Sequence, residues 1–159
     1  MIIRDAVEAD LPAIVEIYNA AIPGRLAWFR EHTPAERPIW VLEIDGGVAG
    51  WISFQSFYGR PAHRATAEVS IYVSPLHRRR GVGRGLLAEA IRRAPSFGVT
   101  TLLGFIFAHN EPSLRLFEGF GFQRWARLPR VANLDGVERD LDILGLRVPH
   151  IPSAAFQKP

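Results

Sequence analysis

Residues 68–87 read EVSIYVSPLHRRRGVGRGLL, and their pattern predicts a strand, a glycine-rich turn and a helix. Apolar residues stand at positions 69, 71 and 73 and alternate with Glu68, Ser70 and Tyr72, which predicts a half-buried strand over 65–74. Pro75 ends the strand. Glycines then lead into apolar residues at helical spacing, which predict a helix over 82–94. A helix that starts from such a turn presents unpaired N–H groups and a positive dipole end, so the turn is a candidate phosphate site.

The other elements follow from the pattern of apolar residues and turns on either side of this stretch. We expect strands at 2–5, 40–44, 48–57 and 101–107, a strand after residue 122 and a final strand near 141–146. Helices are expected from about residue 11, with Asp10 as N-cap, and over 111–118, whereas 23–38 is irregular. The order β-α-ββ-β-α-β-α-β-β predicts an α/β protein with a mixed sheet and helices on both faces.

Length and composition predict one domain over 1–148 and a loosely held tail over 149–159. Hydrophobic residues make up 48% of the chain and charged residues 22%, which is typical of a globular protein rather than a disordered one. No apolar run approaches the roughly 20 residues that span a bilayer, and the N-terminus does not resemble a secretory signal. We therefore expect a cytoplasmic protein with no membrane partner.

The residues that most often bind metals or act as nucleophiles are scarce. Cysteine is absent, which excludes thiol nucleophiles and cysteine–zinc sites. The five histidines are never spaced i, i+4, as a helical metal pair would be, so no metal is expected. Any catalysis must use other side chains.

The charge distribution indicates what kind of ligand the turn would bind. A net charge of +3 and a pI of ≈ 9.9 would suit a polyanion. Basic residues concentrate at 77–80 and at Arg84, around Gly81 and Gly83, whose lack of a side chain permits close backbone approach. Few aromatic residues interleave with them, so we expect a compact phosphate and no nucleic-acid partner. The turn has neither the ending of a P-loop nor the spacing of a dinucleotide fingerprint.

Two motifs resemble those of the GNAT acetyltransferase superfamily. Arg78-x-x-Gly81-x-Gly83 is similar to its pyrophosphate motif, R/Q-x-x-G-x-G/A. The segment 110–122, NEPSLRLFEGFGF, resembles its second motif, N-x-x-S-x-x-L followed by glycine and phenylalanine. Within the superfamily, 68–74 and 110–113 resemble the phosphinothricin acetyltransferase branch, which includes methionine sulfoximine acetyltransferases. The likeness extends from Ile3 to about Leu146.

This resemblance implies a GNAT-like fold with a mostly antiparallel sheet of six to seven strands. It also implies direct acetyl transfer, in a ternary complex, from acetyl-CoA as acyl donor to the primary amine of a small amino-acid-like molecule. Homodimers are common among such proteins. Backbone groups of Ile71, Tyr72 and Val73 are expected to pair with the pantetheine arm like an added strand. The other cofactor-binding candidates are Arg78, Arg79, Arg80, Gly81, Val82, Gly83, Arg84, Asn110 and Ser113.

Acetyl transfer to an amine requires one group that accepts a proton from the amine and a source of a proton for the departing thiolate. The amine must lose a proton before it attacks a thioester, and Glu68 matches the position of the branch's proposed general base, acting through water. The alternative is a salt-bridged strand carboxylate that faces solvent. Phe117 occupies a position where related enzymes often carry Tyr or His, and it cannot protonate the departing thiolate. Water, Tyr72 or no acid at all serves that step, and Tyr72 is otherwise a packed strand aromatic.

Two polar residues of the second motif each have two interpretations. Asn110 caps its helix, binds pantetheine amides or does both, since its amide has separate donors and acceptor. Ser113 reaches a CoA phosphate or merely occupies the first helical turn.

Candidates for acceptor binding come from two irregular segments. In 57–64, Arg60 or Arg64 could hold a carboxylate through a bidentate pair, with Tyr58 beside them; the alternative is a solvated basic loop. Trp28 and Phe29 line a substrate mouth or cover the core.

One further segment departs from the branch. Residues 136–141 correspond to its W-x-D-like segment but keep only the aspartate, with Glu138 in place of the tryptophan, which argues against a herbicide-type substrate. This change and Phe117 motivate an alternative function, a non-catalytic acyl-CoA-binding or sensing module of the same fold. Glu68 argues against that alternative.

Overall fold

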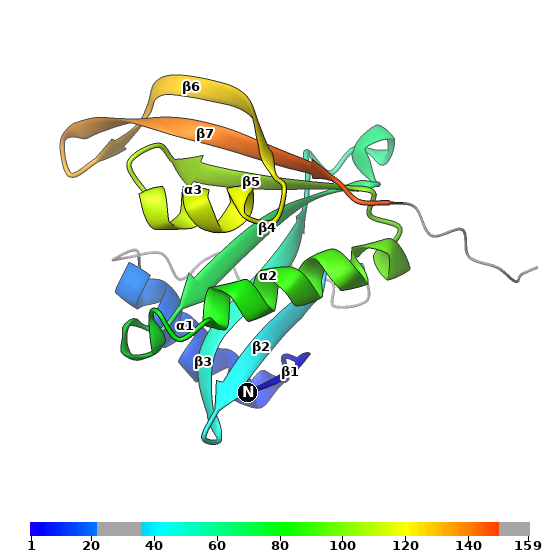
Figure 1. Cartoon of the computed structure of the whole chain (residues 1–159), viewed down its shortest axis with the longest axis vertical. Helices are drawn as coiled ribbons and strands as arrows, with labels where there is room; N and C mark the ends of the chain where they lie inside the picture. The colour runs from blue at the N-terminus through cyan, green and yellow to red at the C-terminus, as the bar shows by residue number, and fades with distance from the viewer. Residues whose placement is uncertain (22–35, 150–159) are drawn as a thin grey trace, which may run out of the picture.

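Seven strands form one sheet in the order β1-β2-β3-β4-β5-β7-β6 (Figure 1). The computed structural model describes residues 1–21 and 36–149. The strands are β1 Ile2–Asp5, β2 Ile39–Ile44, β3 Gly47–Ser56, β4 Thr66–Val73, β5 Thr101–Phe107, β6 Gln123–Leu134 and β7 Val137–Arg147. The α-helices are α1 Leu11–Ala21, α2 Val82–Arg93 and α3 Glu111–Glu118. Short 3₁₀ helices are η1 Glu8–Asp10, η3 Pro61–His63, η4 Pro75–His77 and η5 Ala94–Phe97.

Neighbouring strands are antiparallel except β4 and β5, which are parallel. This arrangement confirms the predicted mixed, mostly antiparallel sheet. Tight hairpins join two of the five antiparallel pairs. Asp45 and Gly46 between β2 and β3 have φ of 53° and 79°, and Asp135 and Gly136 between β6 and β7 have 52° and 82°. Two successive residues with positive φ are the geometry that matches the twist of paired strands.

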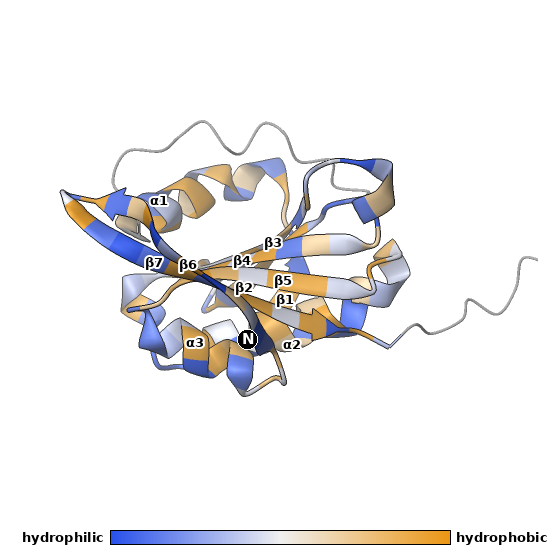
Figure 2. Cartoon of the chain, turned by 90° about the horizontal axis from the view of Figure 1, so that it is seen from above, coloured by the Kyte–Doolittle hydropathy of each residue, from blue (hydrophilic) through white to orange (hydrophobic). Residues whose placement is uncertain are grey.

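Helices cover both faces of the sheet, as the sequence predicted. Figure 2 shows α1 on one face and α2 and α3 on the other. The larger core lies under α2 and α3, where Leu86 and Leu87 pack against side chains such as Trp40 and Phe54. A smaller core under α1 joins Ile14 and its neighbours to β2 and β3. None of the helices in the described ranges is long and apolar enough to cross a membrane.

The prediction that Asp10 is the N-cap of α1 is wrong. Asp10 ends η1, and its carboxylate accepts hydrogen bonds from Arg4 at 2.7 and 2.8 Å and from Val7 N at 2.8 Å. Arg4 also bonds to Glu43 of β2. The guanidinium competes for the carboxylate more strongly than a helix N–H group does, because the pair is charge-assisted and bidentate. Asp10 therefore ties β1 to η1.

We expect Asp10→Asn to destabilise the fold by about 2 kcal/mol, because Arg4 then loses the negative charge of its partner. The pair with Arg4 lowers the pKa of Asp10 in the folded chain. Its stabilisation is therefore present at neutral pH and is lost as the pH falls through the depressed value. Urea unfolding at pH 7 and at pH 3 checks this. The difference in free energy of unfolding between the variant and the wild type should be smaller at pH 3. Glu8→Gln, at an exposed carboxylate in the same 3₁₀ turn, is the control; an equal effect at Glu8 would contradict the assignment.

Candidate active site

The candidate phosphate site lies at the start of α2. Gly81 is the N-cap of this helix and has φ +82°, in the left-handed region that favours glycine. Its carbonyl accepts a hydrogen bond from Gly85 N at 2.9 Å, and no side chain caps the helix. The N–H groups of the first turn therefore have no intrahelical acceptor. A Cβ atom at Gly81 would meet nothing within 4 Å, so a ligand can approach this backbone.

Four exposed arginines surround this turn. None of them makes an ion pair with another residue of the described chain, whereas Arg92 and Arg93, farther along α2, both pair with Glu89. The turn thus gathers positive charge that the described residues do not neutralise, which suits an anion site. The four residues are Arg78, Arg79, Arg80 and Arg84.

Two other glycines let the start of α2 pack closely against its neighbours. A Cβ atom at Gly83 would lie 3.2 Å from Cδ2 of Leu116 in α3. At Gly50 in β3, a Cβ atom would come within 2.8 Å of both the carbonyl oxygen of Tyr72 and Cγ1 of Val82. The missing side chains let α2 pack closely on the sheet and on α3. Gly83 therefore supports the turn through helix packing, in addition to the backbone access that the motif predicts.

β4 has a free edge next to this turn. β4 and β5 pair only over residues 66–68 and 101–103. Beyond them β5 continues alongside β7, and β4 and β5 separate (Figure 1). On its other side β4 stays paired with β3 as far as Val73. Among the described residues, backbone groups of Ile71, Tyr72 and Val73 that face β5 therefore have no strand partner, as an added strand would require.

The second motif forms the start of α3. Asn110 is the N-cap, and its Oδ1 accepts a hydrogen bond from Ser113 N at 3.3 Å. The capping interpretation of Asn110 is confirmed, and its NH₂ group remains available. Ser113 is half-buried in the first turn.

Phe117 is part of the core. It is buried, its ring centre lies 4.8 Å from that of Phe122, and a Cβ atom at Gly104 would stand 2.5 Å from its Cε1. The glycine of β5 thus makes room for this ring. The position has a packing role and no group that could donate a proton.

Glu68 is half-buried on the face of β4 that α1 covers. Alternation along the strand puts Ser70 and Tyr72 on the same face, and Gln55 of β3 lies opposite Glu68. The carboxylate makes no hydrogen bond or ion pair within the described chain, and burial raises its pKa. The described residues therefore offer no salt bridge of the kind the alternative interpretation required.

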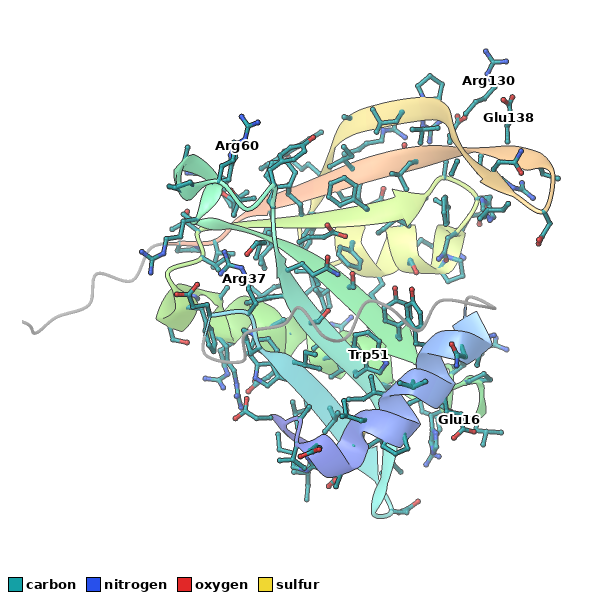
Figure 3. The ribbon with its side chains drawn as sticks, turned by 180° about the vertical axis from the view of Figure 1, so that it is seen from behind. Glu16, Arg37, Trp51, Arg60, Arg130 and Glu138 are labelled. Atoms are coloured by element: carbon teal, nitrogen blue, oxygen red, sulfur yellow. The ribbon has the colours of Figure 1, made fainter. Side chains whose placement is uncertain are left out.

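Tyr72 is a packed aromatic. Its ring stacks on Trp51 at 4.5 Å and meets Tyr18 edge-on at 5.1 Å. Burial raises its pKa to about 12, so its hydroxyl stays protonated at neutral pH. Figure 3, seen from the α1 side, shows Trp51 beside that helix.

The structure describes three of the five acceptor candidates. Trp28 and Phe29 lie outside the described residues. Tyr58 is 77% exposed, with φ 55°. Arg60 is exposed, and Arg64 is an exposed residue 4.0 Å from Glu36. All three lie in the loop that leads into β4, close along the chain to Glu68.

The segment that replaces W-x-D lies elsewhere. Figure 3 shows Glu138 and Arg130 at the end of the β6–β7 hairpin, on the opposite side of the molecule from Arg60. Asp140, the retained aspartate, accepts a hydrogen bond from Arg130 N at 2.9 Å, where the pairing of β6 with β7 is irregular. Within the described chain its visible role is to hold this irregular pairing.

Two buried polar residues that no sequence motif indicated belong to this part of the structure. Arg37 is 8% exposed and donates to Ser56 Oγ, to the carbonyl of Arg64 and to that of Glu36, which ties the acceptor loop to the end of β3. Ser53 of β3 is fully buried. Neither belongs to a motif, and only the alternation of β3 could have placed Ser53 on the face of Glu68.

Comparison with known proteins agrees with these features. The model of the acetyltransferase (GNAT) family matches residues 3–122. A Bacillus subtilis protein named as a candidate phosphinothricin acetyltransferase is 48% identical over 160 residues, 91% of this chain and 98% of its own. The L-methionine sulfoximine/L-methionine sulfone acetyltransferase of Salmonella typhimurium is 34% identical over 162 residues, 93% of this chain and 95% of its own.

A solved structure extends the comparison to the cofactor. The phosphinothricin acetyltransferase of Sinorhizobium meliloti in complex with acetyl-CoA has a TM-score of 0.83 and 27% identity, covering 97% of this chain and 91% of that one. These relatives carry the names of enzymes, which disfavours the sensing alternative. The family match over 3–122 includes both motifs. This chain belongs to the GNAT acetyltransferase family of acetyl-CoA-dependent N-acyltransferases.

Proposed function

We propose that this protein N-acetylates a small amino-acid-like amine, with acetyl-CoA as the acyl donor. The observation that carries the proposal is the free edge of β4 between two functional elements, the open turn at Gly81 and the unpaired carboxylate of Glu68. Related enzymes whose names specify phosphinothricin or methionine sulfoximine support the substrate class.

The residues present fit acetyl-CoA. The pantetheine arm would lie along Ile71, Tyr72 and Val73 and hydrogen-bond to the backbone that β5 leaves free. The pyrophosphate would bind the first-turn N–H groups at Gly81, Val82 and Gly83, with Arg78, Arg79, Arg80 and Arg84 adding guanidinium donors. Asn110 and Ser113 at the start of α3 would complete the site.

Glu68 acts as general base in this proposal. Bound acetyl-CoA supplies the acetyl group as a thioester. Glu68 takes one proton from the substrate ammonium through water, which frees the nitrogen lone pair. The nitrogen–carbon bond forms, the carbon–sulfur bond breaks, and its electron pair leaves with sulfur. The second proton of the nitrogen passes to the thiolate through water, since Phe117 cannot donate one.

The loop before β4 would hold the acceptor. Arg60 or Arg64 would pair with its carboxylate, and Tyr58 would pack beside it. Arg37 fixes this loop to β3. Trp28 and Phe29 remain candidates for the opposite wall.

Thiol release from acetyl-CoA over a panel of amines tests the function. We expect turnover with L-amino acids or their analogues, including methionine sulfoximine, and at least a tenfold lower kcat/KM for the matching amine without a carboxylate, since an arginine pair contributes about 1.4 kcal/mol or more. Phosphinothricin belongs in the panel because Glu138 replaces the branch's tryptophan. No turnover with any amine would refute the proposal.

Arg78→Gln and Arg80→Gln should each weaken CoA binding about five- to tenfold, because each removes a charge-assisted bond to phosphate. Calorimetric titration with CoA measures this, and the loss should shrink in high salt. Arg92→Gln is the matched control, an exposed arginine of α2 that already pairs with Glu89. An equal loss at Arg92 would point to a diffuse charge effect instead of a site.

Glu68→Gln should lower kcat at least a hundredfold, the usual range for a lost general base. Because burial raises the pKa of Glu68, its ionisation costs the folded state stability as the pH rises from the ordinary carboxyl value through the raised one. The variant should therefore have a higher melting temperature than the wild type at pH 8. This difference in melting temperature should disappear below pH 4. Wild-type kcat/KM should rise with pH as Glu68 ionises.

Glu89→Gln is the control for Glu68. Arg92 and Arg93 lower the pKa of Glu89 to about 2, so this variant should lose stability and keep its kcat. If Glu68→Gln keeps the kcat of the wild type, Glu68 is not the general base.

A further inference from the structure

Ser53 has a buried hydroxyl that finds no hydrogen-bond partner among the described residues. The residue is fully buried in β3, and its Oγ makes no hydrogen bond within the described chain. Trp51, two residues earlier on the same face, has an unpaired Nε1 as well. Buried polar atoms in native proteins are almost always bonded to protein groups or to ordered water. Two residues with such atoms on one face of β3 indicate a face that binds water or ligand atoms.

Ser70 lies directly across from Ser53 in the pairing of β3 with β4. Cβ atoms of directly opposed residues stand about 5 Å apart. The two hydroxyls nevertheless make no hydrogen bond to each other, so they are more than 3.5 Å apart or badly oriented. A water molecule between two such hydroxyls can bond to both, and Ser70 is only half-buried.

Glu68 is the next residue along this face. It lies two residues before Ser70 on β4 and is the diagonal neighbour of Ser53 across the strand pair. Diagonal neighbours are about 7–8 Å apart, within reach of a long side chain. Its carboxylate has no competing partner in the described chain. A water held by the two serines would therefore have a proton acceptor within reach.

We propose that Ser53 and Ser70 hold the water through which the acceptor amine passes its proton to Glu68. The water oxygen accepts a proton from the ammonium as one of its own protons moves to a carboxylate oxygen, so the water is regenerated. The amine is left neutral with its lone pair, and Glu68 is left protonated. Ser53 is thus a positioning residue, and this inference rests on the proposed function.

Ser53→Ala separates this role from a structural one. Removing a buried hydroxyl that makes no protein hydrogen bond should leave the melting temperature unchanged or raise it. We expect kcat to fall about tenfold with the KM for acetyl-CoA unchanged, because part of a general-base effect of 10²- to 10⁴-fold depends on the water's position. Ser70→Ala, at a half-buried site that tolerates change more readily, should show the same loss. Ser96→Ala, whose hydroxyl bonds to Arg93 far from this face, should change nothing.

Combined variants complete the test. The double variant of Ser53 and Ser70 should lose no more than either single one, since both act through one water. Neither change should lower kcat further in the Glu68→Gln background. The relay would be overturned if Ser53→Ala and Ser70→Ala kept the kcat of the wild type, or if either change lowered kcat further in the Glu68→Gln variant. Either result would leave the role of Glu68 as general base intact. Full activity of Glu68→Gln would overturn the proposed base and the relay with it.

Discussion

Parallel pairing between β4 and β5 stops after Glu68 and Leu103, and this separation gives a seven-stranded sheet an internal edge. A strand edge is normally a site of unwanted association. Here it lies inside the molecule, next to the start of α2 on one side and the start of α3 on the other. β5 can leave β4 because β7 satisfies its other edge along its whole length. The hairpin of β6 and β7 therefore makes the opening possible.

The packing of α2 keeps the open turn in place. Gly50 and Gly83 remove the side chains that would hold the helix away from β3 and α3. Core residues of α2 are fully buried against the sheet, so the first-turn N–H groups are fixed relative to the β4 edge. Such rigid placement is what an anion site needs, since binding then costs little ordering of the protein.

Carboxylates that pair with arginine differ from Glu68 in the direction of their pKa shift. Asp10, Glu89 and Asp142 each pair with arginine, and each has a lowered pKa. On the α1 face, Glu68 has a raised pKa and Ser53 an unpaired hydroxyl. Unpaired buried polar groups cost stability, and they persist where function uses them. The contrast within one small chain separates groups that stabilise the fold from those proposed to move a proton.

The sequence by itself determined the elements and the family. Alternation and glycine-bearing turns located β4, β5 and α3 almost to the residue, because local periodicity reports which side of an element is buried. The motifs at 78–83 and 110–122 determined the family without coordinates, and Asp10 shows where local reasoning failed, since its partner Arg4 belongs to another element.

Only the tertiary structure decided how the site is assembled. Three features depend on how segments far apart in sequence pack. The first is the register that sets Ser53 opposite Ser70 and Gln55 opposite Glu68. The others are the early separation of β4 from β5 and the placement of Glu138 away from Arg60. A strand pattern gives the face of each residue but not its neighbour across the sheet, because register is set by long-range pairing and turn geometry.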